Sequence, residues 1–194
     1  NKVYGVAMAL LAGDGLLTRA FELMAETKDT GVDPESLLTV IKEIGNAAGS
    51  QGMVGGQVVD MLSEGKEIDL ETLKYIHAHK TGALFRASIR SGAILSGASE
   101  EDLERLTSFA EYLGLAFQIT DDILDVVGDE EKLGKPVGSD EEHVKATYPA
   151  LVGLEESKRL AREVVQKGKE ALEPYGEKAK IFKQLLDFIL TREN

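Results

Sequence analysis

Apolar residues recur at spacings of three and four along almost the whole of this 194-residue chain, while alternating runs are scarce. This period is typical of one face of an α-helix, whereas a half-buried strand needs strict alternation. The chain length fits one domain with a sizeable core, which we expect to span residues 1–194. The sequence therefore predicts an all-α protein, built as a helical bundle.

Helix start signals divide the chain into segments. Asp33 precedes Pro34, Asp69 precedes an apolar run, and Ser99 with Asp102 resembles a capping box. The glycine-rich part of the second segment also allows a division into two helices. The predicted helices lie near residues 2–27, 34–62, 70–96, 100–127, 150–173 and 176–192.

Composition excludes several classes of partner. Acidic residues outnumber basic ones by 34 to 22, a net charge of −12, which disfavours nucleic acid and anionic membrane surfaces. No membrane span is expected, because the most apolar stretch is interrupted by Asp14 and is shorter than the roughly 18 to 20 residues a span needs. Cysteine is absent, which agrees with a cytoplasmic location.

The segment "GLAFQITDDILDVVGD" crowds three carboxylates into an otherwise apolar helix. Asp125, Gln118 and Asp122 lie about 40°, 60° and 100° from Asp121 around the helix axis. Like charges at such spacings destabilise a helix, and a divalent cation would reverse that effect. Mg²⁺ takes carboxylate and phosphate oxygens. The alternative is a simple solvated face, and the residues alone leave both open.

Three lysines and a hydroxyl could accompany such an ion. Lys80 and Thr81 lie in "HAHKTGALFRA", while Lys135 and Lys145 lie in the long connection 128–149. A diphosphate needs this combination, because a metal can bind some of its oxygens while ammonium groups bind others. Each lysine alone could equally be a surface residue.

A glycine-rich stretch, "GNAAGSQGMVGGQVVDM", precedes Gln57 and Asp60. Its glycines would form a stripe without side chains on one helix, allowing close approach of a neighbouring helix or of a long ligand. Tight helix packing explains the glycines as well as a ligand does, but it explains Gln57 and Asp60 less well. The glycines of the stripe are Gly45, Gly49, Gly52 and Gly56.

The remaining charged side chains suggest no second site. His77 and His79 are two residues apart and do not share a helix face, which disfavours a two-histidine metal site. Arg86 and Arg90 share a face directed away from Lys80, where we expect them to be exposed or ion-paired.

Five motifs, in order, resemble those of the trans-isoprenyl diphosphate synthases, in particular bacterial farnesyl and geranylgeranyl diphosphate synthases. They are "GGQVVD", "HKTGALFRASIRSGAIL", "FQITDDILDVVGD", "LGKPVGSD" and "KATYP". The resemblance implies a helical bundle of the isoprenoid synthase type around a deep central cavity, usually in a homodimer. It also implies a Mg²⁺-dependent prenyltransferase that joins isopentenyl diphosphate to an allylic diphosphate.

The resemblance assigns roles residue by residue. It assigns Asp121, Asp122 and Asp125 to the metal-binding second aspartate-rich motif, with Asp121 the foremost direct ligand. It also makes Lys80 and Asp121 the expected catalytic residues. The expected substrate contacts are Lys80, Thr81, Gln118, Lys135 and Lys145, with Gln57 and Asp60 lining the cavity.

The family also carries a first aspartate-rich motif and an arginine pair, which precede the stretch that begins at Asn1. We therefore expect this chain to be the C-terminal portion of a longer synthase. Three alternatives stay open: a non-catalytic partner subunit, a terpene cyclase of the same fold, and a plain helical structural domain. The sequence leaves product chain length undetermined.

Overall fold

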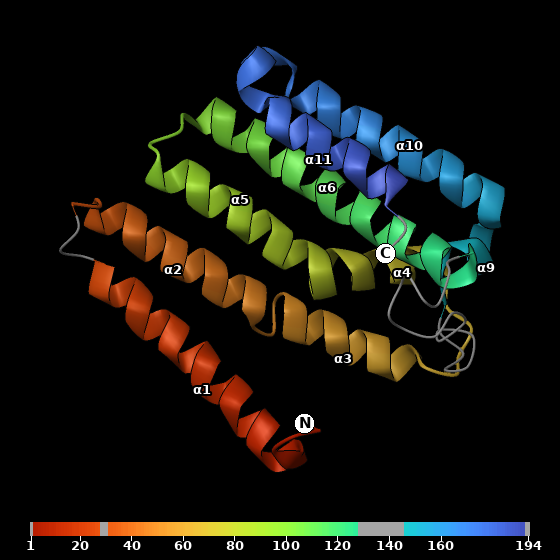
Figure 1. Ribbon diagram of the computed structural model, residues 1–194, viewed down its shortest axis with the longest axis horizontal. Helices are drawn as coiled ribbons and strands as arrows, with labels where there is room; N and C mark the ends of the chain where they lie inside the picture. Colours follow the sequence, from red (N-terminus) through yellow and green to blue (C-terminus); the bar gives the residue numbers. More distant parts are fainter. Residues whose placement is uncertain (1, 28–30, 128–145, 193–194) are drawn as a thin grey trace.

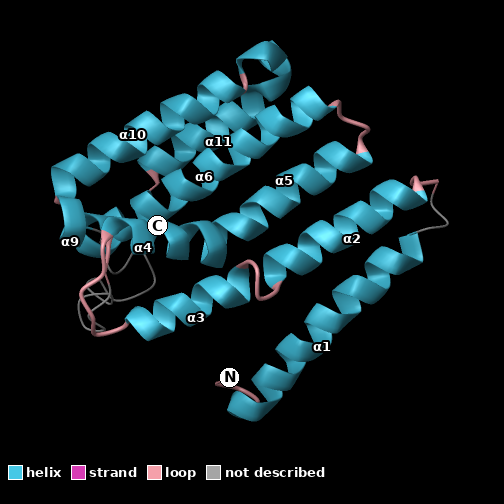
Figure 2. Cartoon of the chain, turned by 180° about the vertical axis from the view of Figure 1, so that it is seen from behind, coloured by secondary structure: helices cyan, strands magenta, loops and turns pink. Residues whose placement is uncertain are grey.

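A computed structural model describes residues 2–27, 31–127 and 146–192. Every regular element in these ranges is helical, as Figure 2 shows, which confirms the predicted all-α class. Between α4 and α5 lies a π-helical turn, η2, and a 3₁₀ segment, η3, precedes the last helix. The elements are α1 (Gly5–Glu26), α2 (Pro34–Ala48), α3 (Met53–Ser63), α4 (Leu70–His77), η2 (Ala78–Gly82), α5 (Ala83–Leu95), α6 (Glu100–Val127), α9 (Tyr148–Val152), α10 (Leu154–Ala171), η3 (Glu173–Ala179) and α11 (Lys180–Thr191).

The predicted helix starts are confirmed by their caps. The Asp33 carboxylate accepts a hydrogen bond from the Ser36 backbone N–H at 2.8 Å. Asp69 does the same for Thr72, also at 2.8 Å. Ser99 Oγ accepts from the backbone N–H three residues further on, at 3.1 Å. Each cap satisfies one of the backbone donors that a helix leaves unpaired at its first turn.

The glycine-rich stretch ends one helix and begins another, so its glycines do not form a stripe along a single helix. Gly49 caps α2 in an extended conformation, and α3 starts after Gly52. A Cβ at Gly52 would lie 2.2 Å from the Ala47 carbonyl oxygen, so this tight reversal needs glycine. The connection to α10 uses another glycine, Gly153, whose φ of 86° favours glycine and separates α9 from α10.

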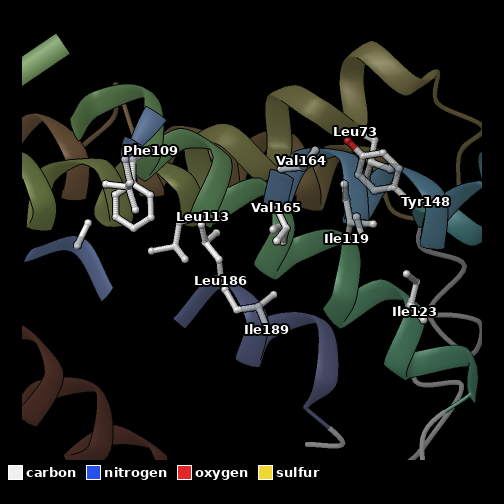
Figure 3. Packing of buried hydrophobic residues seen from close by; sticks show 14 residues of the cluster. Leu73, Phe109, Leu113, Ile119, Ile123, Tyr148, Val164, Val165, Leu186 and Ile189 are labelled. Atoms are coloured by element: carbon white, nitrogen blue, oxygen red, sulfur yellow. The ribbon is translucent and has the colours of Figure 1, made fainter. Parts of the chain in front are cut away.

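The long helix α6 is the centre of the bundle. It packs against α5 on one side and against α10 and α11 on the other, while α2 packs on α5 and α1 on α2 (Figure 1). The core lies mainly between α6, α10 and α11, with contributions from α4 and α9 (Figure 3). Its labelled members include Leu73, Phe109, Leu113, Ile119, Ile123, Tyr148, Val164, Val165, Leu186 and Ile189.

Two close backbone approaches fix the turn η2 within the bundle. A Cβ at Gly56 of α3 would lie 2.2 Å from the backbone nitrogen of Lys80. On the other side, a Cβ at Gly114 of α6 would lie 3.2 Å from Gly82 Cα. The tight-packing interpretation is thus confirmed for Gly56. Glycines on both neighbours allow α3 and α6 to hold η2 between them, which brings residues of three distant motifs together.

Candidate functional site

Lys80 and Asp60 form an ion pair between η2 and α3. Lys80 Nζ donates to Asp60 Oδ2 at 2.7 Å, and the two side chains are 34% and 14% exposed, respectively. The Asp60 side chain is therefore largely desolvated, while about a third of the Lys80 side chain stays exposed. Gln57 lies on the same helix as Asp60, three residues earlier, and is partly buried. The pair gives a long lysine side chain a defined direction.

The next residue of η2 contacts α6. The Thr81 hydroxyl donates to Gln118 Oε1 at 3.1 Å, across 37 residues of sequence. Gln118 precedes Asp121 by three residues on α6, so the two lie on the same face of that helix. The structure thus brings together Asp60, Lys80, Thr81, Gln118 and Asp121, as the motifs predict.

The three aspartates of the acidic segment differ in environment. The Asp121 side chain is 37% exposed. Asp122 and Asp125 are buried, with 8% and 2% of the whole residue exposed. The solvated-face alternative is therefore wrong for Asp122 and Asp125. A single acidic wall is also an inaccurate picture, because only Asp121 of the three presents a substantially exposed carboxylate.

Arg192 contacts Asp121 from the end of α11, a relationship that the sequence did not reveal. One guanidinium nitrogen of Arg192 donates to Asp121 Oδ1 at 3.1 Å and to the Phe117 carbonyl at 3.2 Å. The guanidinium also stacks over the Phe117 ring, 4.2 Å from its centroid. No motif includes Arg192, which lies 71 residues from Asp121, so only the tertiary structure identifies it.

His77 lies among the charged groups of the site, although its sequence pattern was uninformative. Burial lowers the pKa of His77 from 6.5 to about 4, Asp60 and Asp121 act against this shift, and Lys80 reinforces it. His77 is therefore neutral near pH 7. Its Nε2 lies 3.8 Å from Asp122 Oδ1, too far for a hydrogen bond.

Metal binding by protein groups alone is not evident among the described residues. Within the described ranges, no three His, Asp or Glu side chains are placed to hold a metal ion. Mg²⁺, however, keeps several waters and is commonly bound by one or two carboxylates together with substrate phosphates. The partly exposed Asp121 fits that mode. Lys135 and Lys145 lie outside the described residues.

A cavity of about 770 Å³ opens elsewhere, between α2, α4, α5 and α6. His77 and Gly82 line it, but Lys80, Thr81 and Asp121 do not. Arg90 nearby makes a two-nitrogen contact with Glu43, its Nε and Nη2 lying 2.8 to 3.1 Å from the carboxylate oxygens. Arg86 approaches Glu111 at 3.9 Å. The ion-paired interpretation of both arginines is confirmed.

The polyprenyl synthetase family model matches residues 1–185. The chain belongs to the polyprenyl synthetase family. The likeness suggested by the five motifs is thereby confirmed, and the all-α fold agrees with it. In the described part of this chain, no helix combines the length and the apolar character that a membrane span requires.

Relatives of this chain share much of its sequence. It is 50% identical over 194 residues to a dimethylallyltranstransferase of Fischerella ambigua, covering 99% of this chain and 56% of the relative. It is 54% identical over 154 residues to farnesyl diphosphate synthase of Geobacillus stearothermophilus, covering 79% of this chain and 52% of that protein. The chain thus spans about half the length of these relatives.

A solved structure shows the same arrangement of helices. The geranyltransferase of Helicobacter pylori, crystallised with magnesium and isoprenyl diphosphate, is 31% identical and superposes with a TM-score of 0.80. The match covers 96% of this chain and 60% of that protein. The fold of the polyprenyl synthetase family therefore extends over nearly all of this chain.

Proposed function

We propose that the protein containing this chain is a Mg²⁺-dependent prenyltransferase that condenses isopentenyl diphosphate with an allylic diphosphate. The product would be a short-chain prenyl diphosphate such as farnesyl or geranylgeranyl diphosphate. The observation that carries the proposal is the convergence of Asp60, Lys80, Thr81, Gln118 and Asp121 from α3, η2 and α6. The names of the relatives support the same reaction class.

Lys80 and Thr81 would bind the allylic diphosphate. Departure of the leaving group places negative charge on diphosphate oxygens, and an ammonium aimed at them stabilises the transition state more than the ground state. Asp60 already fixes the direction of Lys80 Nζ, so little reorganisation is needed at that moment. Thr81 and Gln118 would supply further hydrogen bonds to the same substrate.

Asp121 would hold magnesium, and Asp125 is proposed more weakly as a second ligand because it is buried. The metal would neutralise charge on the diphosphate oxygens. Arg192 occupies Asp121 Oδ1 at 3.1 Å and so restricts the orientation of that carboxylate. Lys135 and Lys145 are proposed as additional diphosphate contacts on the strength of their motifs alone.

The apolar helix faces would exclude water from the reacting carbon atoms, since a carbocation formed in contact with water would be hydrolysed.

We further propose a cytoplasmic homodimer. Its support is that α1 has no buried residue and exposes large apolar side chains, including Val6, Leu10 and Leu16. Sedimentation of the full-length protein would measure the oligomeric state.

The test compares the full-length protein with its Asp121→Ala variant, using labelled isopentenyl diphosphate and saturating magnesium. Loss of chain elongation by at least roughly tenfold, the equivalent of 1.36 kcal/mol, is expected. Near-wild-type activity would remove the metal role of Asp121. Diphosphate release without incorporation of label would instead favour a cyclase, and absence of both reactions in the wild type would favour a partner subunit.

A further inference from the structure

Asp122 is adjacent to Asp121 in sequence but makes a different kind of contact. Its Oδ2 accepts a hydrogen bond from the Tyr148 backbone N–H at 2.9 Å, across 26 residues of sequence. The Asp122 side chain is only 10% exposed, against 37% for Asp121. The carboxylate of Asp122 therefore joins the acidic helix α6 to the first residue of α9.

A second side chain completes this contact. His77, at the end of α4, places Nε2 3.8 Å from Asp122 Oδ1, and its ring centroid lies 5.6 Å from that of Tyr148. Tyr148 itself is 2% exposed and belongs to the hydrophobic core. Three elements thus meet at one buried carboxylate. The His77–Asp122 separation of 3.8 Å is too long for a hydrogen bond, so the bond from the Tyr148 N–H is the stronger of the two contacts to this carboxylate.

The energetics favour keeping that bond intact. A buried carboxylate is costly unless hydrogen bonds replace its water. A hydrogen bond to a charged group is stronger than one between neutral groups, and a buried group left without its partner loses more than the bond alone. Coordination of a hard cation through Oδ2 would compete with the Tyr148 N–H. Asp121 Oδ1 also accepts a hydrogen bond, from Arg192 at 3.1 Å, but the Asp121 side chain is 37% exposed, so an ion can reach that carboxylate from solvent.

We propose that Asp122 is a positioning residue: it ties α9 to the acidic helix and does not bind the metal itself. This inference rests on the proposed function, because it assigns two different roles within the aspartate-rich motif. Asp121 is the metal ligand, and Asp122 is the anchor that holds α9 against α6. Asparagine at position 122 keeps an oxygen that can accept from Tyr148 and removes the charge that a metal needs. Alanine removes both.

The first measurement uses neither metal nor substrate. The full-length protein, labelled with ¹⁵N-tyrosine, is followed by amide hydrogen exchange; the chain has five tyrosines, and the Tyr148 signal is identified with a Tyr148→Phe variant. Asp122→Ala should accelerate exchange of the Tyr148 amide by roughly 10- to 100-fold. Asp122→Asn should accelerate it much less. Unchanged exchange in Asp122→Ala would overturn the anchor.

The second measurement is the magnesium concentration that gives half-maximal prenyl transfer. Asp122→Asn should stay within about threefold of the wild type, whereas Asp121→Asn should raise it by at least roughly tenfold, as loss of a charged ligand requires. An equal rise in both variants would overturn the proposal, even if Asp122→Ala fails to fold. If Asp121→Asn has no effect, the proposed metal role fails, while the amide-exchange result still decides the anchor.

Discussion

Lys80 Nζ lies 2.7 Å from Asp60 Oδ2, which joins a π-helical turn to the glycine-rich helix α3. Lysine has a long, flexible stem and usually gains little from an exposed ion pair. Here the carboxylate is only 14% exposed, so the pair is held more firmly than a surface pair. Asp60 therefore fixes the direction of the Lys80 side chain. Replacing Asp60 should in consequence have a measurable effect on substrate binding.

Replacing Asp60 by Asn should weaken binding of an allylic diphosphate analogue and lower kcat/KM by roughly 10- to 100-fold, because the ammonium loses its fixed orientation. Lys80→Ala should have an effect at least as large. The measurement is a double-mutant cycle in the full-length protein, with affinity and kcat/KM determined separately. Strictly additive effects of the two substitutions would show that Asp60 does not act through Lys80.

Gly56→Ala should destabilise the protein by roughly 1–3 kcal/mol, because its Cβ would lie 2.2 Å from the Lys80 backbone nitrogen. The matched control is Gly92→Ala in α5, where a Cβ would meet no atom within 4 Å. That substitution should stabilise the folded protein by roughly 0.5–1 kcal/mol, because alanine is more favourable than glycine inside a helix. Urea unfolding measures both. Equal effects would mean that the close approach of α3 to η2 does not constrain position 56.

Local sequence signals predicted the helices well because caps and apolar spacing act within a few residues. Asp33 and Asp69 form the predicted caps, and α6 spans the predicted range of residues 100–127. The π-helical turn was not predictable from spacing, since its hydrogen-bond pattern differs from that of an α-helix without a distinct apolar period. Its position also depends on tertiary approaches at Gly56 and Gly114.

The site was only partly predictable for a related reason. A helical wheel places Asp121 and Asp122 relative to each other, but it does not say which neighbouring element covers either one. Asp122 is covered by Tyr148, and Asp121 contacts Arg192, at the far end of the described chain. Contacts of that sequence separation leave no local pattern, so the family motifs identified the residues but not their different environments.

Glu43 and Arg90 should contribute stability that disappears in acid. The hydrogen bonds from Arg90 lower the pKa of Glu43 below its ordinary value of 4.5. Because the folded-state pKa is the lower one, the stabilisation is fully present above pH 4.5 and is lost as pH falls through the folded value. Glu43→Gln should cost roughly 1–2 kcal/mol at pH 7. Urea unfolding from pH 7 to 3 measures the difference from wild type, which should shrink below pH 4.5; a constant difference would contradict the prediction.

His77 should produce a pH dependence in a separate, higher window. Burial lowers its pKa from 6.5 to about 4, so between these values the unfolded chain binds a proton that the folded protein does not. Stability should therefore fall as pH decreases from 6.5 towards 4, by at most roughly 3 kcal/mol from this one group. A His77→Gln variant lacks the titrating ring and should lose this component, so its unfolding free energy approaches that of the wild type as pH falls. The measurement is urea unfolding of both proteins at half-unit steps, with the difference above pH 7 as the reference. Parallel profiles between pH 6.5 and 4 would show that His77 takes up its proton equally in the folded and unfolded states.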